Sequence, residues 1–141
     1  MRKKKLIALY FIILVIVAAF IVSIMDKQGD IFGTERQTKY TMYIGLNDGD
    51  TQEQKFTAEQ AKSMMYDICR KYTGGYTIYD ARGYWYDDTK PATLSENTLV
   101  CVFFDIEPEN VKSIMDDAIR AFNQNSILLE TQEVRRAFYE K

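Results

Sequence analysis

Histidine is absent from this sequence, and cysteine occurs only twice among its 141 residues. The lack of histidine excludes the commonest general base, the commonest zinc ligand and the usual nucleophilic triads. Cys69 and Cys101 each occupy an apolar position of a periodic segment, so we expect either small buried hydrophobic residues or, in an oxidising compartment, one disulfide. Spacing alone does not decide between these two states. The sequence predicts no catalytic residue and no cofactor.

Acidic residues outnumber basic ones outside the first few residues. Four of the 18 basic residues, at positions 2–5, precede all 20 acidic residues, so the chain from residue 26 onward has 14 basic and 20 acidic residues and a formal charge of −6. An acidic domain without a basic stripe repels the phosphate backbone of nucleic acids. We therefore expect no nucleic-acid partner, and a cation or a basic partner suits the domain better.

A long apolar run lies near the N-terminus. Leu6–Met25 contains no charged residue, and at about 1.5 Å per residue a helix of this length spans the roughly 30 Å of bilayer hydrocarbon. The basic residues before this run favour a cytoplasmic N-terminus, and no cysteine lies directly after the run, which excludes lipoprotein processing. The alternative is a signal peptide cleaved near Ala19, which would give a secreted protein. The predicted parts are a basic cytoplasmic end (1–5), a transmembrane signal anchor (6–25), a linker (26–38) and an extracytoplasmic domain (39–141).

The periodicity of apolar residues in the predicted domain indicates an order of strands and helices. Apolar residues alternate in the strand-like segments, and they recur at three- and four-residue steps after a possible capping box of Thr57 and Gln60 and again after Pro108. The predicted strands are 39–46, 76–86, 97–106 and 126–131, the helices 57–72 and 108–122, with a loop at 87–95 and a short strand or tail at 134–139. This β-α-β-β-α-β order predicts an α+β, ferredoxin-like sandwich: an antiparallel four-stranded sheet with both helices on one face.

The third predicted strand is apolar on both of its sides from Leu99 to Phe104. A sheet with one face in water would alternate, so we expect the face that the helices leave open to be covered. A second copy of the domain would cover it in a homodimer, and the alternatives are another protein or the terminal segment of the chain. The residues expected on this face are Tyr43, Val100, Val102 and Phe104.

Two groups of residues are candidate sites. Asn47, Asp48 and Asp50 could offer oxygen ligands to calcium, but a plain turn uses the same residue types and the spacing departs from the EF-hand, so we favour the turn. An aromatic group around Asp80 and Arg82, which point the same way on one strand and could form an ion pair, could bind a sugar or a peptide. Cross-strand packing is the alternative explanation for these aromatic residues. The group consists of Tyr76, Tyr79, Asp80, Arg82, Tyr84, Trp85 and Tyr86.

Four segments of the domain resemble a known family. They are Tyr43–Leu46, Gly75–Trp85, Ser95–Thr98 and Ala121–Leu128. In these segments the chain resembles the uncharacterised bacterial family named domain of unknown function 3574, whose members typically carry an export signal before one compact domain. The resemblance extends over about residues 37–139. It implies a fold and a compartment, and it implies no activity because none is established for the family.

These observations lead to two functional hypotheses. The first is a membrane-tethered extracytoplasmic binding or assembly module that dimerises through the open face of its sheet. The second is a small enzyme of the dimeric α+β barrel type, in which a Tyr or Asp transfers a proton in a cavity between two sheets. A cavity of several hundred Å³ walled by polar groups of the sheet would favour the enzyme, whereas a filled, dry interface would exclude it.

Overall fold

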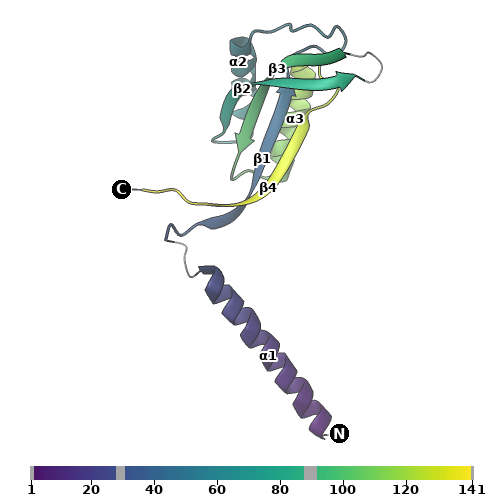
Figure 1. Cartoon of the computed structure of the whole chain (residues 1–141). Coiled ribbons are helices and arrows are strands. Elements are labelled where there is room, and N and C mark those ends of the chain that lie inside the picture. Colours follow the sequence, from purple (N-terminus) through teal and green to yellow (C-terminus); the bar gives the residue numbers. More distant parts are fainter. Residues whose placement is uncertain (1, 28–30, 88–91, 141) are drawn as a thin grey trace. The chain divides into compact units, whose positions relative to one another are not determined.

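The structure is a computed structural model that describes residues 2–27, 31–87 and 92–140. The chain consists of two compact units, one of Met1–Glu35 with Arg135–Lys141 and one of Arg36–Val134. The helices and strands of the described residues are α1 (Arg2–Lys27), β1 (Glu35–Gly45), α2 (Ala58–Cys69), β2 (Thr77–Asp87), β3 (Ala92–Phe103), α3 (Pro108–Phe122) and β4 (Leu128–Arg136), as Figure 1 shows.

The first unit contains α1 and the two stretches of sequence that come before and after the second unit. The predicted span at 6–25 lies within α1. Among the residues that the structure describes, no helix combines the length and the apolar character needed to span a membrane. Near the C-terminus, Arg135 Nε donates to Thr34 Oγ1 at 2.9 Å. The C-terminal segment of this unit therefore lies beside the residues that lead into β1.

The second unit is built on one sheet with the strand order β2-β3-β1-β4. β1 and β2 both run antiparallel to β3, with Met42 opposite Cys101 in one pair of strands and Tyr79 opposite Val100 in the other. The predicted α+β fold with a four-stranded antiparallel sheet is confirmed. After α1 the elements follow one another in the order β-α-β-β-α-β.

Both helices of this unit pack on the same face of the sheet, which Figure 1 shows as the layer behind the strands. Alternate strand residues such as Met42, Ile44 and Leu99 belong to a single core with residues of α2 and α3. Successive strand residues point to opposite faces, so the residues between them lie on the other face, called the open face below. The register places Thr41, Tyr43, Gly45, Ala81, Gly83, Glu96, Thr98, Val100 and Val102 on the open face.

The two cysteines belong to this core. Cys69 at the end of α2 and Cys101 on β3 are both buried, and both thiols are free. Burial raises the pKa of the Cys69 thiol to about 12 and raises that of Cys101 as well. The sequence left open whether Cys69 and Cys101 are buried free thiols or form a disulfide. In the structure they are buried free thiols.

The starts of both helices match the sequence prediction because they depend on local signals, whereas α2 ends at Cys69, three residues before the predicted end at 72. Thr57 Oγ1 accepts from the backbone nitrogen of Gln60 at 3.2 Å, and the side chain of Gln60 accepts from the backbone nitrogen of Thr57 at 2.9 Å, which confirms the capping box. α3 starts at Pro108 and ends before Asn123, whose φ of 50° is left-handed.

Several strand boundaries differ from the prediction. β1 begins at Glu35, within the predicted linker, and β3 begins at Ala92, within the predicted loop, and ends at Phe103. β4 is one strand, Leu128–Arg136, where the sequence predicts two pieces. These added segments are largely polar, so they pair through backbone hydrogen bonds without the apolar alternation that marks a strand. Residues 28–30 of the linker and 88–91 of the loop lie outside the described residues.

Candidate functional site

A cleft of about 540 Å³ lies in the second unit, on the open face of the sheet. Three strands form its floor, with Tyr43 from β1, Gly83 from β2, and Glu96 and Thr98 from β3. Its walls are the loop after β1 and the loop after α3. The wall residues include Asn47, Gly49, Gln52, Gln124 and Asn125.

Two glycines make room for polar side chains in the floor, one for the carboxylate of Glu96 and one for the hydroxyl of Thr98. The side chain of Glu96 lies against Gly45, where an added Cβ would be 2.5 Å from the carboxyl carbon of Glu96, and real Cβ atoms do not approach other atoms within 3.0 Å. Gly83 pairs with Glu96 on the other neighbouring strand, and a Cβ there would meet Thr98 Oγ1 at 2.9 Å. The absence of a side chain at Gly45 therefore leaves a space that the carboxylate occupies, and the absence of one at Gly83 leaves room for the Thr98 hydroxyl.

The environment of Glu96 favours its neutral form. Burial raises the pKa of the Glu96 carboxyl above its ordinary value of 4.5, against the opposing effect of the backbone N–H of Asn47, which donates to Oε2 at 3.2 Å. Among the described residues that line the cleft, Glu96 is the only aspartate, glutamate, lysine or arginine. The cleft thus contains one partly desolvated carboxylate among aromatic, amide and hydroxyl groups.

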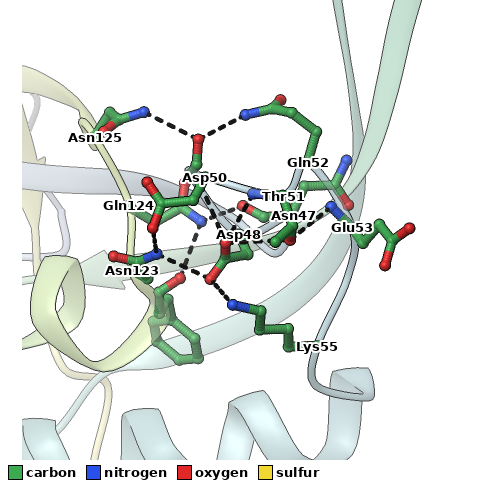
Figure 2. A network of polar contacts seen from close by, with 12 residues as sticks. Asn47, Asp48, Asp50, Thr51, Gln52, Glu53, Lys55, Asn123, Gln124 and Asn125 are labelled. Carbon is green, nitrogen blue, oxygen red and sulfur yellow. Dashed lines mark hydrogen bonds and ion pairs between the residues drawn. The ribbon is translucent and has the colours of Figure 1, made fainter.

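A second carboxylate, Asp48, holds the walls of the cleft together. Its side chain is only 2% exposed, and it accepts hydrogen bonds from the backbone nitrogens of Asp50 at 3.1 Å and Thr51 at 3.0 Å. Lys55 Nζ at 2.5 Å and Asn123 Nδ2 at 3.0 Å donate to its other oxygen, as Figure 2 shows. The hydrogen bond from Lys55, followed by that from Asn123, holds the pKa of Asp48 well below its usual range.

Further hydrogen bonds join the two loops that form the walls. The backbone nitrogen of Gly49 donates to the carbonyl of Asn123 at 2.8 Å, and a Cβ at Gly49 would come within 2.7 Å of that oxygen. Gln124 Nε2 donates to the carbonyl of Asn47 at 2.5 Å, and Asn123 also donates to Asp50 at 2.8 Å. Figure 2 shows the polar contacts between these two loops. The loop after β1 and the loop after α3 therefore form one connected wall.

This network bears on the calcium hypothesis for Asn47, Asp48 and Asp50. The oxygens of Asp48 are occupied by donors of the protein itself, which is how an aspartate stabilises a tight turn. In the described parts of the chain, no three His, Cys, Asp or Glu side chains gather in an arrangement that would hold a metal ion. The structure therefore has the plain turn at this position.

The residues that the sequence predicts on the face left open by the helices are Tyr43, Val100, Val102 and Phe104. The first three lie together on the open face of the sheet. Tyr43 and Tyr79 flank Val100 on the neighbouring strands, and Val100 is only 1% exposed. Tyr43 donates from its hydroxyl to Glu130 Oε2 at 3.0 Å, and this hydrogen bond raises the pKa of Tyr43. Side chains of the chain itself therefore bury Val100. Val102 is half-buried on the same face, and Phe104 follows the end of β3.

The aromatic group predicted along β2 does not form one surface. Tyr79 and Trp85 face the cleft side of the sheet, and Tyr84 also borders the cleft, whereas Asp80, Arg82 and Tyr86 alternate with them. Tyr76 stacks on Phe103 in the core, with ring centroids 5.9 Å apart.

Asp80 and Arg82 have separate partners. Asp80 pairs with Lys62 of α2 at 2.7 Å, and Arg82 donates to Asn97 Oδ1 at 3.1 Å and to Ser95 Oγ at 2.9 Å. These contacts take the place of the Asp80–Arg82 ion pair that the sequence allows.

Sequence reasoning identified Tyr43, Tyr84 and Trp85 but missed the carboxylate at the centre of the site. Glu96 lies in a polar stretch with no motif of its own. The available signal was the pair Gly45 and Gly83, because a glycine inside a strand often marks a close approach of another group. All four segments that carry the family resemblance contribute residues to the cleft.

Comparisons with known proteins bear on the fold and the family. The chain is similar to a phage SAM lyase solved in complex with S-methyl-5'-thioadenosine, with a TM-score of 0.52 and 19% identity over 74% of this chain and 93% of that one. The apo structure of a phage SAM lyase gives a TM-score of 0.50 and 19% identity over 74% and 94% of the two chains. At this identity the likeness concerns the fold alone. No curated protein matches the chain. Residues 39–138 match the family described as protein of unknown function (DUF3574), and the chain belongs to that family.

Proposed function

We propose that this protein is a membrane-tethered, extracytoplasmic binding module whose ligand site is the cleft around Glu96. The observation that carries the proposal is a cleft of about 540 Å³ in which polar groups surround one partly buried carboxylate. Sites for small molecules usually measure about 300 to 1,000 Å³ and combine apolar walls with a few polar groups. The cleft has the size of such a site, and its walls are more polar than usual, with Tyr43, Tyr84 and Trp85 as its aromatic groups.

The construction of the cleft supports a binding role. Its floor is a hydrogen-bonded sheet, and its walls are tied together through Asp48, Asn123 and Gln124. A site built this way loses little conformational entropy when a ligand binds, because its groups are already in place.

The tether is supported by the sequence. The uncharged run Leu6–Met25 has the length of a bilayer span, and the basic residues before it favour an extracytoplasmic domain. Protease added to intact cells should digest the domain; protection in intact cells with digestion after lysis would contradict this orientation. Cleavage near Ala19, the alternative, would show as a shortened mature N-terminus in mass spectrometry.

We also infer that the domain is of the ferredoxin-like class and that it associates with itself through the open face. The element order β-α-β-β-α-β and the strand order β2-β3-β1-β4 support the class. Tyr79, 48% exposed, and Leu128, 66% exposed, lie near the cleft and give that region apolar surface for a second copy. Light scattering on the full chain in detergent should give the mass of a dimer, and a monomer at all concentrations would exclude this association.

A matched pair of variants tests the ligand site. Ser126 lines the cleft and is exposed, and Ser126→Phe would fill the cleft without disturbing the core. Ser63 is an exposed serine on α2 that does not line the cleft, so Ser63→Phe is the control. Trp85 lines the cleft and is the only tryptophan, so its fluorescence reports binding directly.

The probes for this test are small amines, their alcohol analogues and S-methyl-5'-thioadenosine, which occurs in one of the similar phage SAM lyase structures. A fluorescence change with at least one probe, lost in Ser126→Phe and kept in Ser63→Phe, is the expected result. A signal that both variants retain would show that the probe binds elsewhere. Absence of any signal in the wild type would contradict a small-molecule site.

An enzyme is the second candidate, because one observation favours it. Burial raises the pKa of the Glu96 carboxyl, which suits a general acid or base, and Tyr43 lines the same cleft. Self-association through the open face would then close the cleft into a cavity. Incubation of the full chain with SAM should yield S-methyl-5'-thioadenosine if the reaction is of that kind. Loss of product in Glu96→Gln would support catalysis, and no product from the wild type would remove this reaction.

A further inference from the structure

We propose that the cleft binds a small organic cation, with the Glu96 carboxylate as its counter-ion. This inference rests on the proposed function of the cleft as a ligand site and specifies the chemical class of the ligand. Three independent features of the cleft support it: its charge, the hydrogen-bonding state of its carboxylate, and the acceptor groups and aromatic rings in its walls.

The charge of the cleft has one sign. Glu96 is the only aspartate, glutamate, lysine or arginine among the described residues that line it. The nearest lysine of the wall network, Lys55, is paired with the buried Asp48 at 2.5 Å and does not line the cleft. Tyr43, which does line it, donates to another carboxylate, that of Glu130. An anionic ligand would meet repulsion here, whereas a cation would meet an opposite charge in a partly desolvated place.

The carboxylates of Asp48 and Glu96 differ in the number of hydrogen bonds that they accept from the protein. An ionised carboxylate has about four acceptor positions. Asp48 receives donors from Asp50, Thr51, Lys55 and Asn123. Within the described residues, Glu96 receives only the backbone N–H of Asn47, at 3.2 Å. Glu96 therefore keeps acceptor capacity directed at the cleft, and the N–H groups of an ammonium ligand would fill it.

The amide side chains of the walls also present acceptors. Gln52 Nε2 donates to the carbonyl of Gly49 at 2.9 Å, and Gln124 Nε2 donates to that of Asn47 at 2.5 Å. Asn125 Nδ2 points to the same Gly49 carbonyl at 3.5 Å, and Figure 2 shows Gln52 and Asn125 approaching it from two sides. Their amide nitrogens are thus engaged in the wall, and each amide also has an oxygen that can accept a hydrogen bond. A ligand rich in N–H donors matches such a site.

Aromatic rings complete the match. Trp85 is 38% exposed and Tyr84 is exposed beside it, both on the border of the cleft. The face of an aromatic ring attracts a cation through its quadrupole, and tryptophan does so most strongly. A carboxylate on the floor and rings on the border would thus hold a cation from two sides.

The test compares ligands that differ only in charge. The full chain, in a non-ionic detergent, is titrated with benzylamine, its uncharged analogue benzyl alcohol and the anion benzoate, with the fluorescence of Trp85 as the signal. We expect the amine to bind at least about tenfold more tightly than the alcohol, which is the effect of one charge-assisted hydrogen bond. In Glu96→Gln this preference should fall to about one. Glu109→Gln, an exposed glutamate on α3, is the matched control and should keep the preference.

Each outcome decides a different point. If the alcohol or benzoate binds as tightly as the amine in the wild type, the cation inference is overturned while the proposed binding site stands. If the preference survives Glu96→Gln, or is lost equally in Glu109→Gln, Glu96 is not the counter-ion. If none of the three probes changes the fluorescence at millimolar concentration, the cation inference is overturned, and S-methyl-5'-thioadenosine then tests the cleft itself. The comparison of amine with alcohol needs only the wild type, so it holds even if a variant fails to fold.

Discussion

Replacement of Gly45 by alanine should move the Glu96 carboxylate without removing it. The new Cβ would be 2.5 Å from the carboxyl carbon of Glu96, and ordinary van der Waals contact begins at 3.4 Å. The carboxyl must therefore retreat by about 1 Å, which the far end of a flexible side chain can do. The φ of Gly45 is not in the left-handed region, so the backbone accepts alanine. The fold should survive while the position of the carboxylate changes.

The expected effects on binding and on stability differ in size. A shift of that size breaks the 3.2 Å hydrogen bond from Asn47 to Glu96, and the freed N–H turns to water, so we expect the free energy of unfolding to change by about 1 kcal/mol or less. A ligand cation loses a charge-assisted hydrogen bond, for which about 1.4 kcal/mol corresponds to a tenfold weaker affinity. Gly45→Ala should thus bind benzylamine about tenfold more weakly at nearly unchanged stability.

Two measurements check this prediction. Fluorescence titration gives the affinity, and NMR titration of the glutamate carboxyl carbons gives the pKa of Glu96, which should fall towards 4.5 as the carboxyl leaves its buried place. Gly74→Ala is the control, since nothing lies within 4 Å of a Cβ at that position. An unchanged pKa together with unchanged affinity would refute the placement of Glu96 against Gly45.

Three further predictions follow from the ionisable groups. Because burial raises the folded-state pKa of Glu96, the wild type should lose stability relative to Glu96→Gln as the pH rises from about 4.5 through the folded value, and thermal unfolding over a pH series that shows no such trend would contradict the burial of this carboxyl. Because Lys55 lowers the pKa of Asp48, the advantage of the wild type over Asp48→Asn should be present above about pH 3.8 and disappear as the pH falls further; an advantage independent of pH would contradict this. Cys69 and Cys101 should react slowly with a thiol reagent at mildly alkaline pH and quickly after denaturation, and equally fast reaction before denaturation would contradict their burial.

The elements that the sequence predicted best are those specified by neighbouring residues. The start of α2 follows from Thr57 and Gln60, and the start of α3 from Pro108, because capping needs only residues within one turn. Strand ends have no comparable local signal. The polar residues from Glu35 onward are strand because they pair with a neighbouring strand, and that neighbour is distant in the sequence. Strand boundaries therefore depend on tertiary structure.

The candidate site depends on register in the same way. Gly45 and Gly83 flank Glu96 only because β1 and β2 pair with opposite edges of β3 in one particular alignment. A shift of one residue would put these positions on the other face of the sheet. Composition drew attention to the aromatic residues of β2. Side chains alternate between the two faces of a sheet along a strand, however, so Trp85 and Arg82, three residues apart, lie on opposite faces. The carboxylate at the centre of the cleft was consequently beyond what composition reveals.

Asp48 and Glu96 show that the same chemical group can have opposite roles in one small region. Asp48 is fully supplied with donors, and its ionised form is stabilised, so it contributes to the walls and has nothing left to offer a ligand. Glu96 is partly buried and has one protein donor among the described residues, so its ionised form is under-compensated. A carboxylate in that state raises the energy of the empty site, and a cation lowers it by supplying the missing donors. The preference of the cleft for a cation follows because Glu96 accepts too few hydrogen bonds from the protein. The Asp48 network preserves this state by keeping the wall residues in place.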